Sequence, residues 1–135
     1  MQKSPSRSIK WLDRQMGVRG HNLCLCLCEQ DYEAVMTNLK ICRYDTWILN
    51  DRSDATCHFL SVLNDIFVVV CLRVRKHITL PQVVGLLVHE AVHIWQEWCE
   101  YYGERIPGQE QEAYAIQSIS QNLLEEYMRQ TKCRK

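Results

Sequence analysis

Short runs of apolar residues in the first half of the chain predict strands. In residues 23–28 leucine alternates with cysteine, so three side chains of each kind would point to opposite faces of a strand. Reduced cysteine behaves as a small apolar side chain, so both faces would be apolar. The pattern therefore predicts a central strand over residues 21–28, covered on both sides, and favours this over a soft-metal site built from the three cysteines.

Three further strands are predicted between residues 43 and 75. Residues 43–49 are rich in β-branched and aromatic side chains, and residues 55–63 and 66–75 follow a polar loop. The junction Asn64-Asp65 indicates a tight hairpin between the last two strands. Because residues 66–72 are apolar on both faces, we expect this strand to be central in the sheet.

Spacings of three and four residues between apolar positions predict helices over residues 29–40, 79–102 and 109–130. The long middle helix has clear boundaries. Thr79 and Gln82 have the spacing of a capping box, with Pro81 in the first turn, and Gly103 is a natural stop. Strands clustered ahead of long helices predict an α+β domain with a small, mainly antiparallel sheet.

Composition limits the domain organisation and the partners. The 135 residues suit one domain at 21–130, between a loose basic arm at 1–20 and a basic tail at 131–135. Lys plus Arg and Asp plus Glu both number 16, so no nucleic-acid partner is expected from charge. No run is long enough for a membrane span and no signal-peptide pattern is present, so we expect a cytoplasmic protein with eight reduced cysteines and no membrane partner. Nothing in the sequence specifies an oligomeric state.

The residues that carry chemistry are His89, Glu90 and His93, in the motif His-Glu-Ala-Val-His. Histidines four residues apart lie on one face of a helix, one turn above each other, and can reach one metal ion. Zinc in such a site lowers the pKa of a coordinated water, and the glutamate takes the proton as the water attacks a carbonyl. The motif predicts one Zn²⁺ per chain, held by the two histidines, with Glu90 as general base.

A hydrolytic zinc takes three protein ligands and keeps one position open, so the third ligand should lie downstream. Glu104, Glu110 and Glu112 are the candidates. Glu112 is favoured because it continues the apolar stripe of Ile116, Ile119 and Leu123 in the last helix, where a buried carboxylate requires a partner. Its position in the first helical turn, where the helix dipole favours acidic residues, is the structural alternative.

The motif and the segment after it resemble a known family. A helical HExxH followed by a second helix with Glu112-Ala113-Tyr114-Ala115 resembles the gluzincin branch of zinc metallopeptidases. More narrowly, HEAVHIWQ and PGQEQEAYAIQ resemble small phage and prophage proteins classed as metallopeptidases. Over residues 82–124, the resemblance implies zinc on His89, His93 and Glu112, and a host-cytoplasmic location.

The same resemblance implies a minimal zincin-like fold, in which an edge strand beside the metal helix pairs with an extended peptide substrate. Residues 55–63 are the candidate strand. Glu110 also stands three residues before an alanine, which leaves the third ligand open between Glu110 and Glu112. Several residues could stabilise the oxyanion, and none is preferred: His58, His77, Tyr101, Tyr102 and Tyr114.

The sequence therefore predicts a zinc-dependent metallopeptidase that acts on a peptide or protein. The alternative is a binding or assembly protein that keeps the fold, with or without a structural zinc, because so short a chain has little wall for a deep cleft. A weaker third interpretation is a nucleic-acid-associated metalloprotein that uses its basic ends.

Overall fold

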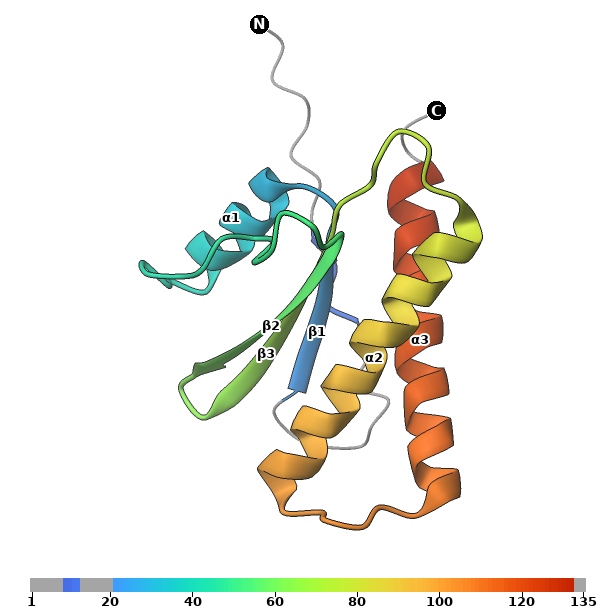
Figure 1. Cartoon of the computed structure of the whole chain (residues 1–135). Coiled ribbons are helices and arrows are strands. Elements are labelled where there is room, and N and C mark those ends of the chain that lie inside the picture. Colours follow the sequence, from blue (N-terminus) through green and yellow to red (C-terminus); the bar gives the residue numbers. More distant parts are fainter. Residues whose placement is uncertain (1–8, 13–20, 133–135) are drawn as a thin grey trace, which may run out of the picture.

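The computed structural model describes residues 9–12 and 21–132. Three strands and three helices follow one another in these residues: β1 (His21–Cys26), α1 (Glu29–Asn38), β2 (Ala55–Val62), β3 (Asp65–Leu72), α2 (Leu80–Tyr102) and α3 (Gln109–Lys132). Helix α1 lies on one face of the sheet, and α2 and α3 lie on the other (Figure 1). The predicted α+β class is confirmed. None of the helices in the described ranges is both long enough and apolar enough to cross a membrane.

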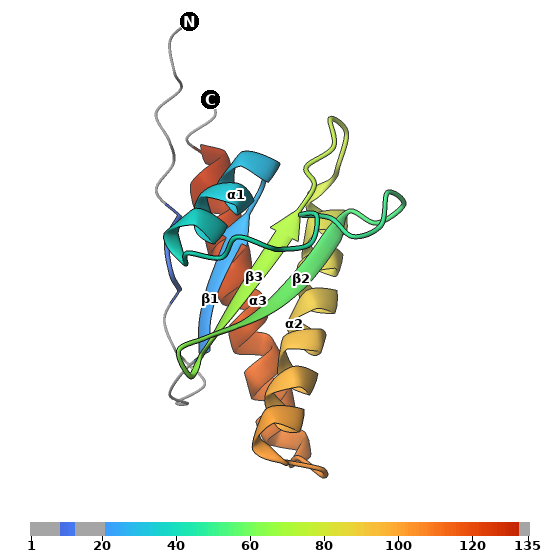
Figure 2. The same ribbon diagram turned by 90° about the vertical axis from the view of Figure 1, so that its left-hand side faces the viewer.

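The sheet has the strand order β1-β3-β2. Strand β3 is central, as predicted, and pairs antiparallel with β2 but parallel with β1. The expectation of a mainly antiparallel sheet is thus wrong for β1, which pairs parallel. The prediction that β1 is a central strand is also wrong, because it lies at an edge of the three-stranded sheet. A parallel pair needs a long connection, and here it consists of α1, the following loop and β2 (Figure 2). Helix α1 and the loop pass over one face of the sheet, and β2 then returns the chain to the end of the sheet where β3 begins.

Apolar side chains on the two faces of the sheet form two separate cores. Alternate residues of β3 divide between them: Val68, Val70 and Leu72 face α2 and α3, whereas Val69 and Cys71 face α1. Strand β1 divides in the same way, with Leu25 toward α2 and α3 and with Cys24 and Cys26 toward α1. Cys24 and Cys26 are therefore core residues, as predicted, whereas Cys28 is half-buried. No disulfide joins two cysteines of the described ranges.

Residues 43–49 do not form the predicted strand but a loop over the α1 face of the sheet. The backbone of this loop bonds to side chains rather than to a neighbouring strand. The Nε2 of His58 lies 2.9 Å from the carbonyl of Trp47, the amide of Leu49 donates to Thr56, and the hydroxyl of Tyr32 donates to the carbonyl of Asp45. These bonds provide hydrogen-bond partners for backbone groups that would otherwise pair with a neighbouring strand.

Helix α2 begins and ends where the sequence predicts. Thr79 is the N-cap of a complete capping box with Gln82, and Gly103 ends the helix in the left-handed conformation at φ 69°. The hairpin before it turns one residue earlier than predicted, because Leu63 and Asn64 both adopt positive φ, at 50° and 69°. Two positive φ values at the centre of a two-residue loop are typical of the turn that matches strand twist.

The ends of the domain are partly described. Residues 1–8, 13–20 and 133–135, which include most of the predicted arm and tail, lie outside the described residues. Residues 9–12 are packed rather than loose: Trp11 contacts Phe67 edge to face at 5.3 Å, and the amide of Leu12 donates to the carbonyl of Leu23. Lys132 belongs to α3, two residues beyond the predicted end.

A buried polar cluster joins α3 to β1. Glu126 is 3% exposed, and its carboxylate accepts hydrogen bonds from Arg129 and from Gln130. The Gln130 amide also donates to the carbonyl of Leu25 at 2.9 Å. Burial opposes ionisation of Glu126, but these donors and the charge of Arg129 outweigh it, so the pKa of Glu126 is lowered. The carboxylate is therefore ionised and fully engaged at neutral pH.

Candidate functional site

The two histidines of the motif converge on one point beside α2. Both side chains are exposed, and their Nε2 atoms lie 3.1 Å apart. Their ring centroids are 4.8 Å apart, and the Nδ1 of His93 lies 3.3 Å from the amide oxygen of Gln96. Helical spacing places the rings one turn apart, and their Nε2 atoms are close enough for both to bind one ion beside them. The structure thus brings His89 and His93 together as predicted.

Glu90 is buried, which the sequence did not predict. It is 5% exposed, and it lines a cavity together with both histidines. Burial raises the pKa of this carboxyl, and the nearby charges of His89 and His93 oppose the rise. A largely buried carboxylate with a raised pKa beside two convergent histidines is typical of a site for chemistry.

These three residues line a cavity of about 480 Å³ between α2 and β2. Ala55, Cys57 and Phe59 of β2 form one wall, and the acidic and amide side chains that follow His93 on α2 form the other: Gln96, Glu97 and Glu100. Strand β2 is an edge of the sheet, which confirms the predicted candidate strand as an edge next to the motif helix. Its outer backbone groups can pair with an added strand.

Glu112 lies on the α2 side of α3, but it is not buried. Its register continues the stripe of Ile116, Ile119 and Leu123, as predicted. However, α3 extends past the sheet at this end, so only α2 lies beside its first turns (Figure 1). The prediction of burial is therefore wrong. The carboxylate accepts a hydrogen bond of 2.8 Å from the indole of Trp95, which is its partner in place of a metal.

The structure does not bring the third predicted ligand to the histidines. In the described part of the chain no group of three or more His, Cys, Asp or Glu side chains is placed to hold a metal ion. Glu112 and Glu104 line a neighbouring cavity of about 520 Å³, which shares Gln96 and Glu100 with the histidine cavity. Glu110 is exposed and lines neither of these two cavities.

None of the five oxyanion candidates lines the histidine cavity. His58 faces the α1 side of the sheet, where its ring stacks on Tyr32 at 4.7 Å. Tyr101 and Tyr102 are exposed near the end of α2, and His77 lines a cavity beside the first turns of that helix. The structure therefore gives no support to a role for these side chains at the motif.

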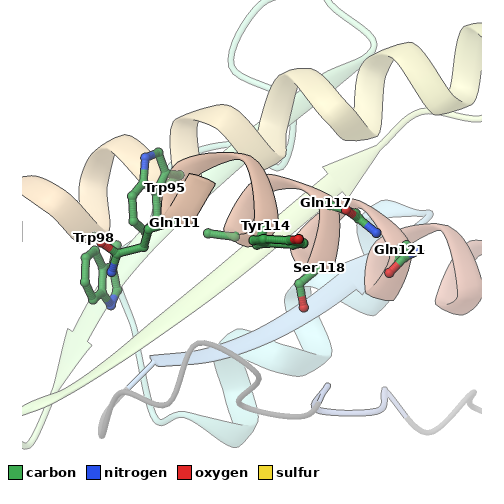
Figure 3. Close-up of a pocket in the computed structure, with 8 residues that line it drawn as sticks. Trp95, Trp98, Gln111, Tyr114, Gln117, Ser118 and Gln121 are labelled. Carbon is green, nitrogen blue, oxygen red and sulfur yellow. The ribbon is translucent and has the colours of Figure 1, made fainter. Parts of the chain in front are cut away.

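A separate cavity of about 400 Å³ lies between α2 and α3 (Figure 3). Its aromatic wall comes from Trp95 and Trp98, whose rings stack at 4.9 Å, and from Tyr114 of α3. Amide and hydroxyl side chains of α3 complete it. Because neither histidine nor Glu90 lines this cavity, the motif chemistry is confined to the β2 side of α2.

Sequence reasoning missed the walls of the histidine cavity. Gln96, Glu97 and Glu100 follow His93 by three, four and seven residues, so helical periodicity was a signal for them. Cys57 and Phe59 had no such signal, since their position beside the motif depends on how β2 packs against α2. Comparison of the chain with protein-family models, curated proteins and solved structures gave no match.

Proposed function

We propose that this protein is a zinc-dependent hydrolase that cleaves peptide bonds, with His89 and His93 as metal ligands and Glu90 as general base. The observation that carries the proposal is the convergence of the two Nε2 atoms, 3.1 Å apart, in a cavity that the largely buried side chain of Glu90 also lines. The zincin-like character of the fold and the cytoplasmic location belong to the same proposal.

The donor set fits zinc in two of its three positions. Neutral imidazole nitrogens are preferred zinc ligands, and both are exposed to the cavity. Bound there, zinc would act as a Lewis acid and lower the pKa of water. The chain's own contribution is Glu90, whose carboxylate lines the same cavity as the two histidines and would accept the proton of the attacking water.

Substrate binding is assigned to the free edge of β2. An extended peptide can add to this edge through backbone hydrogen bonds, which places its carbonyls in the cavity that Cys57, Phe59 and the motif residues line. Backbone pairing holds the peptide without reading its side chains. The orientation of the scissile carbonyl toward Glu90 then follows from the register of the added strand.

We propose Glu112 as the third ligand, after its carboxylate exchanges the indole of Trp95 for the metal. Glu112 already faces α2, and its cavity shares Gln96 and Glu100 with the histidine cavity. Glu112→Gln is expected to weaken zinc binding strongly, whereas Glu110→Gln is expected to leave it unchanged. Equal zinc affinity of the two variants, or the reverse order, would overturn this assignment.

Zinc content and peptide cleavage test the function together. The purified chain should bind about one zinc, and His89→Ala and His93→Ala should lose it. Glu90→Gln should keep the zinc and lose hydrolysis of a mixed peptide library, because it removes the base and no ligand. A chain that cleaves peptides equally well with Glu90→Gln refutes the assigned role of Glu90.

A second candidate function is a non-catalytic binding or assembly role for the same fold. The favouring observation is that the described residues bring together two motif histidines but no third ligand. In that case zinc, if bound, would stabilise the fold, and the wild-type chain would not cleave the library. Glu90→Gln would then leave the biological role intact, which separates this function from the hydrolase.

A further inference from the structure

Another cavity, beside the first turns of α2, is lined by a glycine of that helix. It measures about 650 Å³, and Gly85, Leu86 and Ile78 contribute to its lining. Gly85 lies inside a helix, where only proline is less favourable. A Cβ built at this position meets nothing within 4 Å, so no neighbouring atom requires glycine. The glycine instead leaves the space above the helix backbone open, as at sites where a ligand approaches closely.

This cavity lies next to the histidine cavity. Gly85 precedes His89 by about one helical turn. Asp54 lines the Gly85 cavity, and its neighbours along the chain, Ser53 and Ala55, line the histidine cavity. Gly85 is about 6 Å along the helix axis from His89 and about 12 Å from His93, at 1.5 Å per residue. An extended peptide rises roughly 3.3 Å per residue, so the open space is about two to three residues from a bond held between the histidines.

The two neighbouring cavities carry opposite charge. Lys76 lines the Gly85 cavity, where Arg75 is already paired with Asp54 at 2.6 Å. Glu97 and Glu100 line the histidine cavity. An occupant of complementary charge would be acidic toward Gly85 and basic toward Glu100.

We infer that the cavity over Gly85 is a side-chain pocket for an extended peptide. It accepts a large apolar residue two to three positions from the scissile bond, with an acidic residue next to it and basic residues on the far side of the bond. The inference deepens the proposed function and rests on it for the nature of the occupant. Glycine at position 85 keeps the pocket open because it has no side chain, although glycine is unfavourable inside a helix.

Labelled peptides and two glycine variants test the pocket. The leucine peptide has the sequence Glu-Leu-Ala-Ala-Lys-Lys. The glycine peptide has glycine in place of leucine. Both are also made with the sequence reversed. Fluorescence anisotropy gives the affinities, and cleavage is followed on the same samples with zinc. Gly85→Ala and Gly85→Leu are compared with Gly108→Leu, where a Cβ meets only the side chain of Gln111 at 3.9 Å.

The wild-type chain is expected to bind the leucine peptide roughly ten- to one-hundred-fold more tightly than the glycine peptide in one chain direction. Gly85→Leu should abolish this preference and still fold with an unchanged or higher urea midpoint, and Gly85→Ala should reduce the preference. Gly108→Leu should keep it.

Equal affinities for the two peptides, a preference that survives Gly85→Leu, or no binding at millimolar concentration would each overturn the inference. Its failure is distinct from failure of the hydrolase. Cleavage of both peptides with equal affinity would leave the hydrolase and remove the pocket. A leucine preference lost in Gly85→Leu, without cleavage by the wild type, would keep the pocket and remove the hydrolase.

Discussion

Replacement of Glu126 by glutamine should destabilise the protein in a pH-dependent way. The carboxylate is 3% exposed and accepts from two nitrogens of Arg129 and from the Gln130 amide that also holds the carbonyl of Leu25. Glutamine has nearly the same shape, but its amide nitrogen must face a donor, and its oxygen carries no charge. The variant therefore loses one hydrogen bond and weakens the others.

The size of the effect follows from these contacts. Hydrogen bonds to a charged group contribute about 1.5–3 kcal/mol and neutral ones about 1 kcal/mol. The Arg129 side chain is 45% exposed, so solvent screens part of its interaction with Glu126. We expect Glu126→Gln to lower the free energy of unfolding by about 1–2 kcal/mol at pH 7.

The pH dependence has a definite sign. The pKa of Glu126 is lowered in the folded chain, so its contribution is present above the ordinary carboxyl range and is lost as the pH falls through the folded value. Urea unfolding of wild type and variant at pH 7 and pH 3 should show a smaller difference in the free energy of unfolding at pH 3 than at pH 7. Glu125→Gln, at the exposed neighbouring position, is the control and should differ from wild type by less than about 0.5 kcal/mol at both pH values. A gap that is absent at pH 7, or unchanged at pH 3, would refute the reasoning.

Two further predictions concern the hairpin and the metal. Leu63 is 93% exposed and has φ 50°, a conformation in which leucine is strained. Leu63→Asn should therefore raise the urea midpoint by the equivalent of about 1 kcal/mol. Leu49→Asn, at an exposed position outside the left-handed region, should not raise it. Zinc at a hundred times its dissociation constant should stabilise the wild type by about 2.7 kcal/mol in thermal unfolding, and His93→Ala should abolish the shift while His77→Ala retains it. Zinc stabilisation that persists in His93→Ala would contradict the assignment of His93 as a ligand. An unchanged urea midpoint in Leu63→Asn would contradict the strain at Leu63.

Local signals in the sequence predicted the parts of the fold that depend on neighbours along the chain. The capping box at Thr79 and the stop at Gly103 gave the bounds of α2, and the apolar run from Ile66 gave the central strand β3. Each of these depends on residues within a few positions, so periodicity and capping contain the necessary information.

Features that depend on long-range packing were not predicted. The side chains of Thr56 and His58 hold residues 43–49 as a loop, and only the folded chain brings them together. Glu90 is buried because β2 packs against α2, and Glu112 is exposed because α3 extends past the sheet. Helical periodicity identified the direction in which both glutamates point, but not what lies there.

The most direct test of the central claim is the zinc content of the purified chain and of His89→Ala and His93→Ala, measured after dialysis against a limited excess of zinc. The account predicts about one tightly held zinc per wild-type chain and none in either variant, with both variants folded by circular dichroism. A wild-type chain that binds no zinc, or variants that retain it, would contradict the account.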